Sequence, residues 1–236
     1  AIGDLYSDGQ EDLIVGAPGE NNGDGCLPTL GRGQILILDG SSASWSSAVF
    51  YTESNFGGVP EAGDQFGSTL ATGDFDGNLF ADLAIGQPFE DFDGAAVADA
   101  GQVTVALFRN GPPVLQFWLQ NNIFGFGTTQ AGDWFGFALG VGDFDGDGRD
   151  DLAMGAPGDV VAGTREGTAS VIMGSPAGLT AARLRAIARG REGFPGPAGQ
   201  ADRSFAQALA TGDWNGDGHS DLVVGAPYSD VGGLAD

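Results

Sequence analysis

The 236-residue sequence has no lysine, one histidine and one cysteine. A single cysteine, Cys26, excludes an internal disulfide, and we expect it to be a loop residue without a chemical role. One histidine and one cysteine leave almost no material for a serine or cysteine nucleophile triad, and they are too few for a zinc site. The sequence therefore favours a non-catalytic protein, although a carboxylate pair of the glycosidase type stays open.

Positive charge is equally scarce. Nine basic residues face 32 acidic ones, which gives a net charge of −23. We expect such a surface to repel nucleic acid and anionic membranes. The given residues show neither an apolar run long enough to span a membrane nor a signal-peptide pattern, so we expect no membrane insertion. The chain begins at Ala1 rather than Met, so one expectation is that a leader or a larger upstream portion precedes it.

The sequence contains a motif that occurs four times, and we call each of its recurring parts a phrase. A nine-residue acidic loop is followed by a short apolar run and then by Gly-Ala-Pro or a near copy. The loops begin at Asp4, Asp74, Asp143 and Asp213, so the spacings are 70, 69 and 70 residues, and together they hold fifteen of the acidic residues. A constant period indicates one structural unit copied in tandem.

Each unit holds up to four strand-like segments, the first of which follows an Ala-Gly-Asp-x-Phe-Gly phrase. We expect first strands over 66–72, 135–141 and 205–211, and short runs such as 82–85, 101–106 and 114–118 to supply the others. Four short antiparallel strands per unit predict an all-β fold, a β-propeller of four-stranded antiparallel blades that stack on their neighbours. The approximate units are 1–65 (partial), 66–134, 135–204 and 205–236 (partial).

Two features leave alternatives open. The segment 175–191 holds four of the nine arginines; we favour an outer edge strand with outward-facing arginines over a basic interaction helix. The chain also starts at the end of a first strand and stops before a third, so its segments count three, four, four and two. We expect a piece of a larger propeller, or a protomer completed by neighbours.

The acidic loops have the donor pattern of a calcium site, with oxygen ligands at positions 1, 3, 5 and 9 and a backbone carbonyl at position 7. The third loop is complete, with Asp143, Asp145, Asp147, the carbonyl of Arg149 and Asp151. The fourth has Asp213, Asn215, Asp217, the carbonyl of His219 and Asp221. The second has Asp74, Asp76, Asn78, the carbonyl of Phe80 and Asp82, but Leu79 replaces the usual Gly. The first has Asp4, Asp8 and Asp12, but Tyr6 takes the third position, so we expect weak binding or none.

Other interpretations of the loops are less favourable. An EF-hand needs a bidentate Glu at position 12 and flanking helices, whereas position 12 is Met154 or Val224 inside a strand. Magnesium accepts fewer protein ligands, and a simple turn does not require Asp at position 9 of every copy. The loops therefore predict two to four Ca²⁺ ions per chain.

The order Phe-Gly, acidic loop, Gly-Ala-Pro resembles the FG-GAP repeat of integrin α subunits and of bacterial secreted proteins. The resemblance implies calcium on one rim of the propeller and a partner on the opposite rim. Ala206 in place of Gly and Gln87 in place of Ala depart from the pattern.

Together these features predict a calcium-binding extracellular or cell-surface module for binding or adhesion, with a protein or glycan ligand. The alternatives are a subunit of a secreted filament or surface assembly formed by self-assembly, and a non-catalytic or carbohydrate-binding part of a secreted hydrolase. Trp45, Trp118 and Trp134 could stack on sugar rings, but a packing role is favoured for each.

Overall fold

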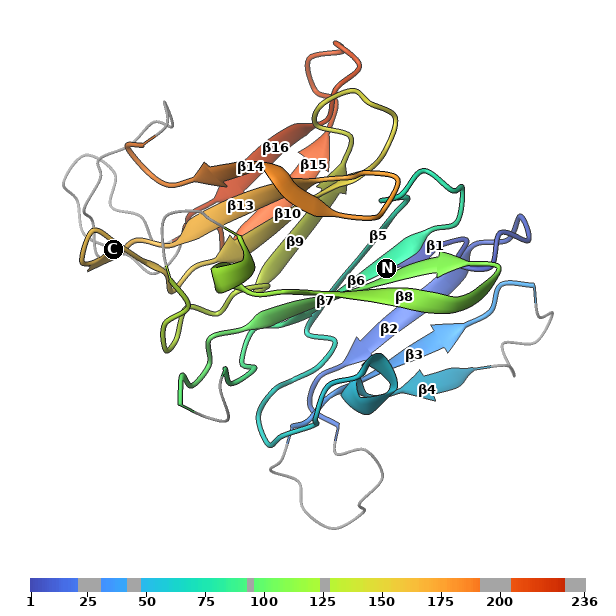
Figure 1. The fold of residues 1–236 in the computed structure, drawn as a ribbon, viewed down its shortest axis with the longest axis horizontal. Coiled ribbons are helices and arrows are strands. Elements are labelled where there is room, and N and C mark those ends of the chain that lie inside the picture. Colours follow the sequence, from blue (N-terminus) through green and yellow to red (C-terminus); the bar gives the residue numbers. More distant parts are fainter. Residues whose placement is uncertain (21–30, 42–47, 93–95, 124–127, 192–204, 228–236) are drawn as a thin grey trace.

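The computed structural model describes residues 1–20, 31–41, 48–92, 96–123, 128–191 and 205–227. Cys26 and Trp45 lie outside this part of the chain. Three four-stranded antiparallel sheets and a fourth, two-stranded sheet stand side by side, each built from strands of one stretch of the chain (Figure 1). Within the described residues no helix is long and apolar enough to cross a bilayer.

The strand order confirms the predicted all-β propeller architecture. The first sheet contains β1 (Ile2–Gly3), β2 (Asp12–Ala17), β3 (Gln34–Leu38) and β4 (Val49–Tyr51). The second contains β5 (Thr69–Gly73), β6 (Asp82–Gln87), β7 (Gln102–Arg109) and β8 (Gly111–Trp118). The third contains β9 (Ala138–Gly142), β10 (Asp151–Ala156), β13 (Thr168–Met173) and β14 (Thr180–Ile187), and the fourth β15 (Ala208–Gly212) and β16 (Asp221–Gly225). A small hairpin joins β11 (Val160–Val161) to β12 (Thr164–Arg165), and short 3-10 helices η1 (Glu53–Phe56) and η2 (Gln120–Asn122) follow β4 and β8.

Three expectations are corrected or decided. The first strands begin three residues later than predicted, because Phe66, Phe135 and Phe205 belong to a turn that precedes the strand and are buried. The first sheet has four strands rather than three, since Ile2–Gly3 pairs with β2. The arginine-rich segment forms the edge strand β14 with Arg183 and Arg185 exposed, so the alternative of a basic helix is wrong.

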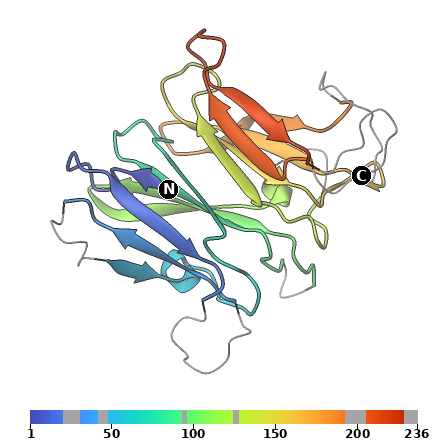
Figure 2. The same cartoon turned by 180° about the vertical axis from the view of Figure 1, so that it is seen from behind.

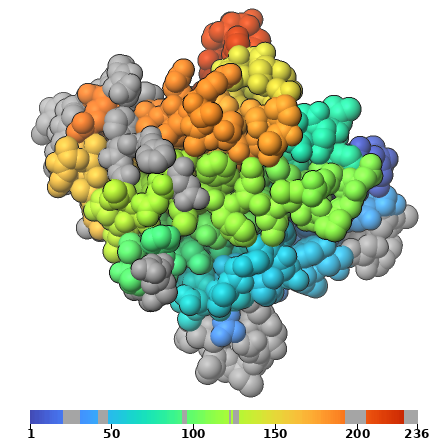
Figure 3. Space-filling view, viewed as in Figure 1, coloured from blue at the N-terminus to red at the C-terminus, as the bar shows by residue number. Residues whose placement is uncertain are grey.

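The first strands of consecutive sheets lie next to one another, and the other strands fan outward, as the view from behind also shows (Figure 2). Small residues permit this close approach: a Cβ on Gly73 would lie 2.5 Å from Cγ1 of Val141 in the next sheet. The segments that carry the outer strands β4, β8 and β14 line one face of the molecule (Figure 3).

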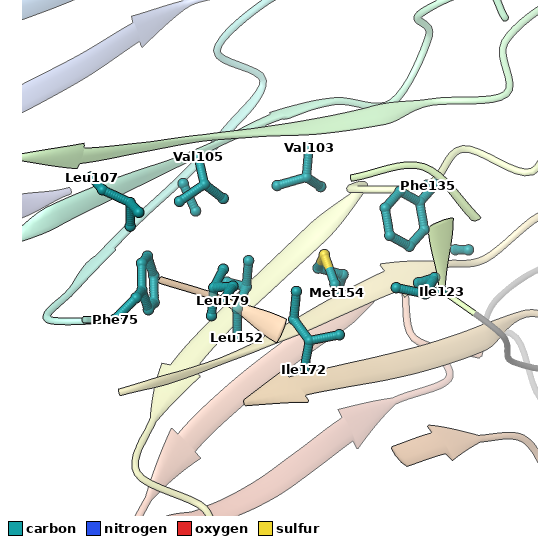
Figure 4. Close-up of a cluster of buried hydrophobic side chains, with 12 residues drawn as sticks. Phe75, Val103, Val105, Leu107, Ile123, Phe135, Leu152, Met154, Ile172 and Leu179 are labelled. Atoms are coloured by element: carbon teal, nitrogen blue, oxygen red, sulfur yellow. The ribbon is translucent and has the colours of Figure 1, made fainter. Parts of the chain in front are cut away.

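The hydrophobic core lies between the sheets rather than within one of them. Val103, Val105 and Leu107 of β7 face Leu152 and Met154 of β10 across the second and third sheets (Figure 4). A second cluster, which includes Ile14, Ile35, Phe56, Phe66 and Leu83, joins the first and second sheets. Each sheet is therefore stabilised by its neighbour, as a repeat architecture requires.

The Gly of the first three Gly-Ala-Pro phrases has a packing role. A Cβ on Gly86 or Gly155 would collide with the carbonyl oxygen of Gly136 or Ala206, the second residue of the Phe-Gly phrase of the following sheet. That second residue has left-handed backbone, with φ of 84° at Gly136 and 64° at Ala206. The two phrases recur together because each fits against the other where two sheets meet.

Candidate metal centres

Each acidic loop connects the first and second strands of its sheet, and the four loops lie along the same edge of the array (Figure 1). The ninth residue of each loop is also the first residue of the second strand. These residues are Asp12, Asp82, Asp151 and Asp221. Their carboxylates are therefore fixed by the sheet.

The ninth-position aspartate joins the loop to the third strand. In the second loop Asp82 is buried and accepts hydrogen bonds from the N–H groups of Phe75 (2.9 Å) and Phe108 (2.8 Å). Asp151 accepts equivalent bonds from Phe144 and Gly174, both 2.8 Å. Burial raises the pKa of Asp82 to about 7, and burial also raises the pKa of Asp151, so both carboxylates lack sufficient compensating positive charge.

The first-position aspartate shapes the loop itself. Asp143 accepts hydrogen bonds from the N–H groups of Gly146, Asp147 and Gly148 at 2.7, 3.1 and 2.9 Å. Asp74 and Asp213 accept the same three bonds in their loops. The sixth position is left-handed throughout, with φ of 84° at Gly148 and 72° at Leu79. The leucine therefore keeps the loop geometry at the cost of a strained backbone.

The second and third loops each bring three predicted ligands together. Carboxylate oxygens of Asp74, Asp76 and Asp82 lie within 4.8 Å of one another, as do those of Asp143, Asp145 and Asp151. Because calcium binds oxygen at about 2.3–2.6 Å, three oxygens at this separation can reach one ion. The donor set of these two loops therefore fits Ca²⁺.

The fifth position supports the seventh in three loops. The side-chain oxygens of Asn78, Asp147 and Asp217 accept the N–H groups of Phe80, Arg149 and His219 at 2.7, 3.0 and 2.9 Å. These bonds fix the residues whose carbonyls are the predicted seventh-position ligands. The amide of Asn78 donates from Nδ2 to the carbonyl of Phe108 at 2.8 Å, which leaves its Oδ1 facing the loop.

The fourth and first loops differ from these two. In the fourth, Nδ2 of Asn215 lies 3.3 Å from Oδ1 of Asp221, so the third and ninth positions meet, although the loop is exposed. In the first, the described structure does not group the carboxylates of Asp4, Asp8 and Asp12 as it does those of the second and third loops. Tyr6, at the third position, instead makes an edge contact with Phe108.

A basic side chain reaches the third loop. The guanidinium of Arg183 on β14 forms an ion pair with Oδ2 of Asp145, and Arg149 forms a second with Asp147 at 3.2 Å. Arg183 therefore neutralises part of the charge that a cation would neutralise. The sequence predicted the arginine-rich edge strand. It could not predict that Arg183 of this strand lies beside the third loop, because only the fold brings the two together.

The loops are also connected in series. The N–H at the eighth position of each later loop donates to the carbonyl at the first position of the loop before it. These bonds join Ala81 to Asp4 (2.9 Å), Asp150 to Asp74 (3.0 Å) and Ser220 to Asp143 (2.8 Å). Each loop is therefore hydrogen-bonded to the loop of the adjacent sheet.

The repeated units also match known proteins. The sequence profile of the FG-GAP repeat matches residues 66–106, 135–172 and 205–236. Integrin alpha-PS2 of Drosophila melanogaster is 35% identical over 169 residues, which is 69% of this chain and 10% of that protein. A phosphatidylinositol-glycan-specific phospholipase D of Rattus norvegicus is 30% identical over 169 residues, 66% of this chain and 18% of that protein. The chain thus spans only about a tenth to a fifth of the length of such relatives.

Solved structures support the fold alone. A rhamnogalacturonan lyase of Bacillus licheniformis superposes with a TM-score of 0.53 at 16% identity, covering 94% of this chain and 38% of the lyase. The exotype rhamnogalacturonan lyase YesX superposes with a TM-score of 0.56 at 14% identity, covering 95% and 38%. By its matched repeats and its sheet order, the chain belongs to the FG-GAP repeat proteins, with integrin α-like blades.

Proposed function

We propose that the protein is a calcium-stabilised, non-catalytic propeller module that acts in binding or adhesion outside the cell. The observation that carries this proposal is the pair of three-carboxylate clusters at Asp74–Asp82 and Asp143–Asp151, each on a hairpin bonded to the next sheet. The relatives named as integrin α subunits support the adhesion role.

In this proposal Ca²⁺ supplies positive charge to the carboxylates and holds the hairpin closed. Asp74, Asp76, Asn78, the Phe80 carbonyl and Asp82 would hold one ion, and the equivalent residues from Asp143 and Asp213 two more. In the first and second loops the second residue belongs to the core, since Leu5 and Phe75 are buried in the clusters between sheets, so an ordered second loop would also order the core around Phe75. The metal thus stabilises the scaffold, while a protein or glycan ligand binds at the opposite end of the sheets.

Thermal unfolding tests the calcium part of the proposal. Extracellular calcium modules have dissociation constants of roughly 10⁻⁴–10⁻³ M, so millimolar Ca²⁺ should raise the melting temperature well above that in a chelator. Magnesium at the same concentration should restore little of the loss. A melting temperature that is unchanged by chelation and by added calcium would contradict the proposal.

A further inference from the structure

A second group of carboxylates lies at the end of the sheets opposite the acidic loops. Glu53 is in η1 after β4, Asp64 precedes the turn before β5, and Glu90 follows the end of β6. The three side chains come from both sides of the junction between the first and second sheets, and their oxygens lie within 4.8 Å of one another. Of these three residues, only Asp64 belongs to a motif that is visible in the sequence, the repeated Ala-Gly-Asp-x-Phe-Gly phrase.

Glu53 is the unusual member of this group. Its side chain is 1% exposed, and both carboxylate oxygens are buried without a hydrogen-bond donor in good geometry, although the Gln87 amide and the N–H of Val59 lie nearby. Gly58 makes room for it: a Cβ there would lie 2.6 Å from Cδ of Glu53. A buried, unpaired carboxylate that points toward two others is costly unless a cation joins them.

The charge around the cluster is strongly negative. Burial, with the charge of Asp64 next, raises the pKa of Glu53 to about 7, and burial with the neighbouring carboxylates raises that of Glu90 to about 9. Glu61 and Asp91 add further negative charge, and Arg32 is the cation that acts on Asp64. Gln87, the departure from Gly-Ala-Pro, is fully buried and donates from Nε2 to Glu90 at 3.3 Å.

The next junction along the chain serves as an internal comparison. Gln120, Asp133 and Asp159 occupy the positions that correspond to Glu53, Asp64 and Glu90. There Thr168 donates to Asp159 at 2.7 Å, and Arg165 bonds to the carbonyls of Gly132 (2.8 Å) and Gly158 (3.2 Å). One carboxylate is thus replaced by an amide and a guanidinium lies close by, so the charge of this junction is compensated in part, although burial still raises the pKa of Asp133 to about 7.

We propose that Glu53, Asp64 and Glu90 bind a divalent cation of the calcium type and so form an inter-sheet site separate from the four loops. An all-oxygen set of three carboxylates suits a hard cation rather than zinc or copper. The ion joins the first and second sheets at the end where the sequence resemblance places the partner, so it would stabilise that surface. This inference does not rest on calcium in the loops.

Glu53→Gln is the direct test, because the next junction already carries Gln at this position and tolerates it. Calcium titration by calorimetry should count one ion fewer in this variant than in the unchanged chain. In chelator the variant should melt at the same temperature or higher, because it lacks the buried unpaired charge, and it should gain less on addition of Ca²⁺. The control is Glu20→Gln, an exposed residue that corresponds to Glu90 in the first sheet; its ion count should not change.

Two outcomes would overturn the inference. One is an unchanged ion count and affinity in Glu53→Gln, which would show that the cluster holds no ion. The other is a crystal grown in calcium whose anomalous map has no peak among the three carboxylates. Asp145→Ala separates this result from the proposed function, because it should remove an ion from the third loop while the ion at Glu53 remains.

Discussion

The backbone N–H of Asp150 donates to the carbonyl oxygen of Asp74 at 3.0 Å, and the carboxylate of Asp150 accepts the N–H of Asp74 at 2.9 Å. The two residues are 76 positions apart and belong to consecutive acidic loops. The second and third loops are therefore joined by two hydrogen bonds between this pair of residues. At the other junctions, Ala81 and Ser220 provide the backbone bond alone.

Removing the Asp150 carboxylate should therefore weaken the junction between the second and third sheets. We expect Asp150→Ala to lower the free energy of unfolding by about 1 kcal/mol, the net value of one such hydrogen bond. Asp150→Asn keeps an oxygen acceptor and should recover most of the loss. Denaturant unfolding in saturating calcium measures both variants, and equal stability of the two would contradict the role assigned to the side chain.

The backbone at Leu79 is strained in a conformation that glycine adopts without strain. Its φ of 72° matches the glycines at the sixth position of the other loops, and its side chain is 82% exposed. Leu79→Gly should stabilise the protein by about 1 kcal/mol. Leu79→Ala is the matched control, since it shortens the exposed side chain but retains the left-handed strain. If alanine stabilised as much as glycine, backbone strain would not be the cause.

Arg183 should weaken calcium binding in the third loop, because its guanidinium already pairs with Asp145. An exposed ion pair is worth up to about 1 kcal/mol, so Arg183→Gln should tighten binding at this loop by about two- to fivefold. Arg185→Gln, on the same exposed edge strand, should leave it unchanged. Calorimetric titration distinguishes the two, and equal effects would indicate a general change in surface charge instead.

Stability without calcium should depend on pH. Burial raises the pKa of Asp82 and Asp133 to about 7 and of Asp64 to about 6, above the values of the unfolded chain. The folded state then binds more protons than the unfolded state between about pH 4 and these values, so stability falls as pH rises through this window. In chelator the melting temperature should be higher at pH 5.5 than at pH 8.5.

Saturating calcium should reduce this pH dependence, because the metal replaces the proton as the partner of Asp64 and Asp82, whereas Asp133 lies in neither proposed kind of site. Glu53→Gln should reduce it in chelator, since one buried carboxylate is lost. A chelated protein that became more stable at high pH would show that other groups dominate the titration.

Repeat spacing was sufficient to predict the four-stranded sheets and the second-strand position of Asp82, because copies of one unit must share one fold. It could not predict that Phe66 and Phe135 lie in a turn, since a buried aromatic next to Gly is equally typical of a strand. Nor could it predict the cluster at Glu53, whose members lie 37 residues apart on two sheets and are joined only when the sheets pack.

The ligand pattern within each loop was predictable because its donors are local in sequence. The second role of the ninth-position aspartate, as an acceptor for backbone N–H groups outside the loop, was not predictable from the sequence. Asp82 and Asp151 also accept hydrogen bonds from N–H groups at the end of the third strand (Phe108) or just after it (Gly174), so their substitution would disturb the fold together with the metal. Third-position variants such as Asp145→Ala are for this reason the cleaner probes of calcium.

The position of the ions themselves tests the central claim most directly. A crystal of the full chain grown in millimolar calcium, measured for anomalous scattering, should show peaks within the loops 74–82, 143–151 and 213–221 and none within 4–12. Absence of a peak among Asp74, Asp76 and Asp82 and among Asp143, Asp145 and Asp151 would contradict the account, because these are the loops in which the structure brings three carboxylates together.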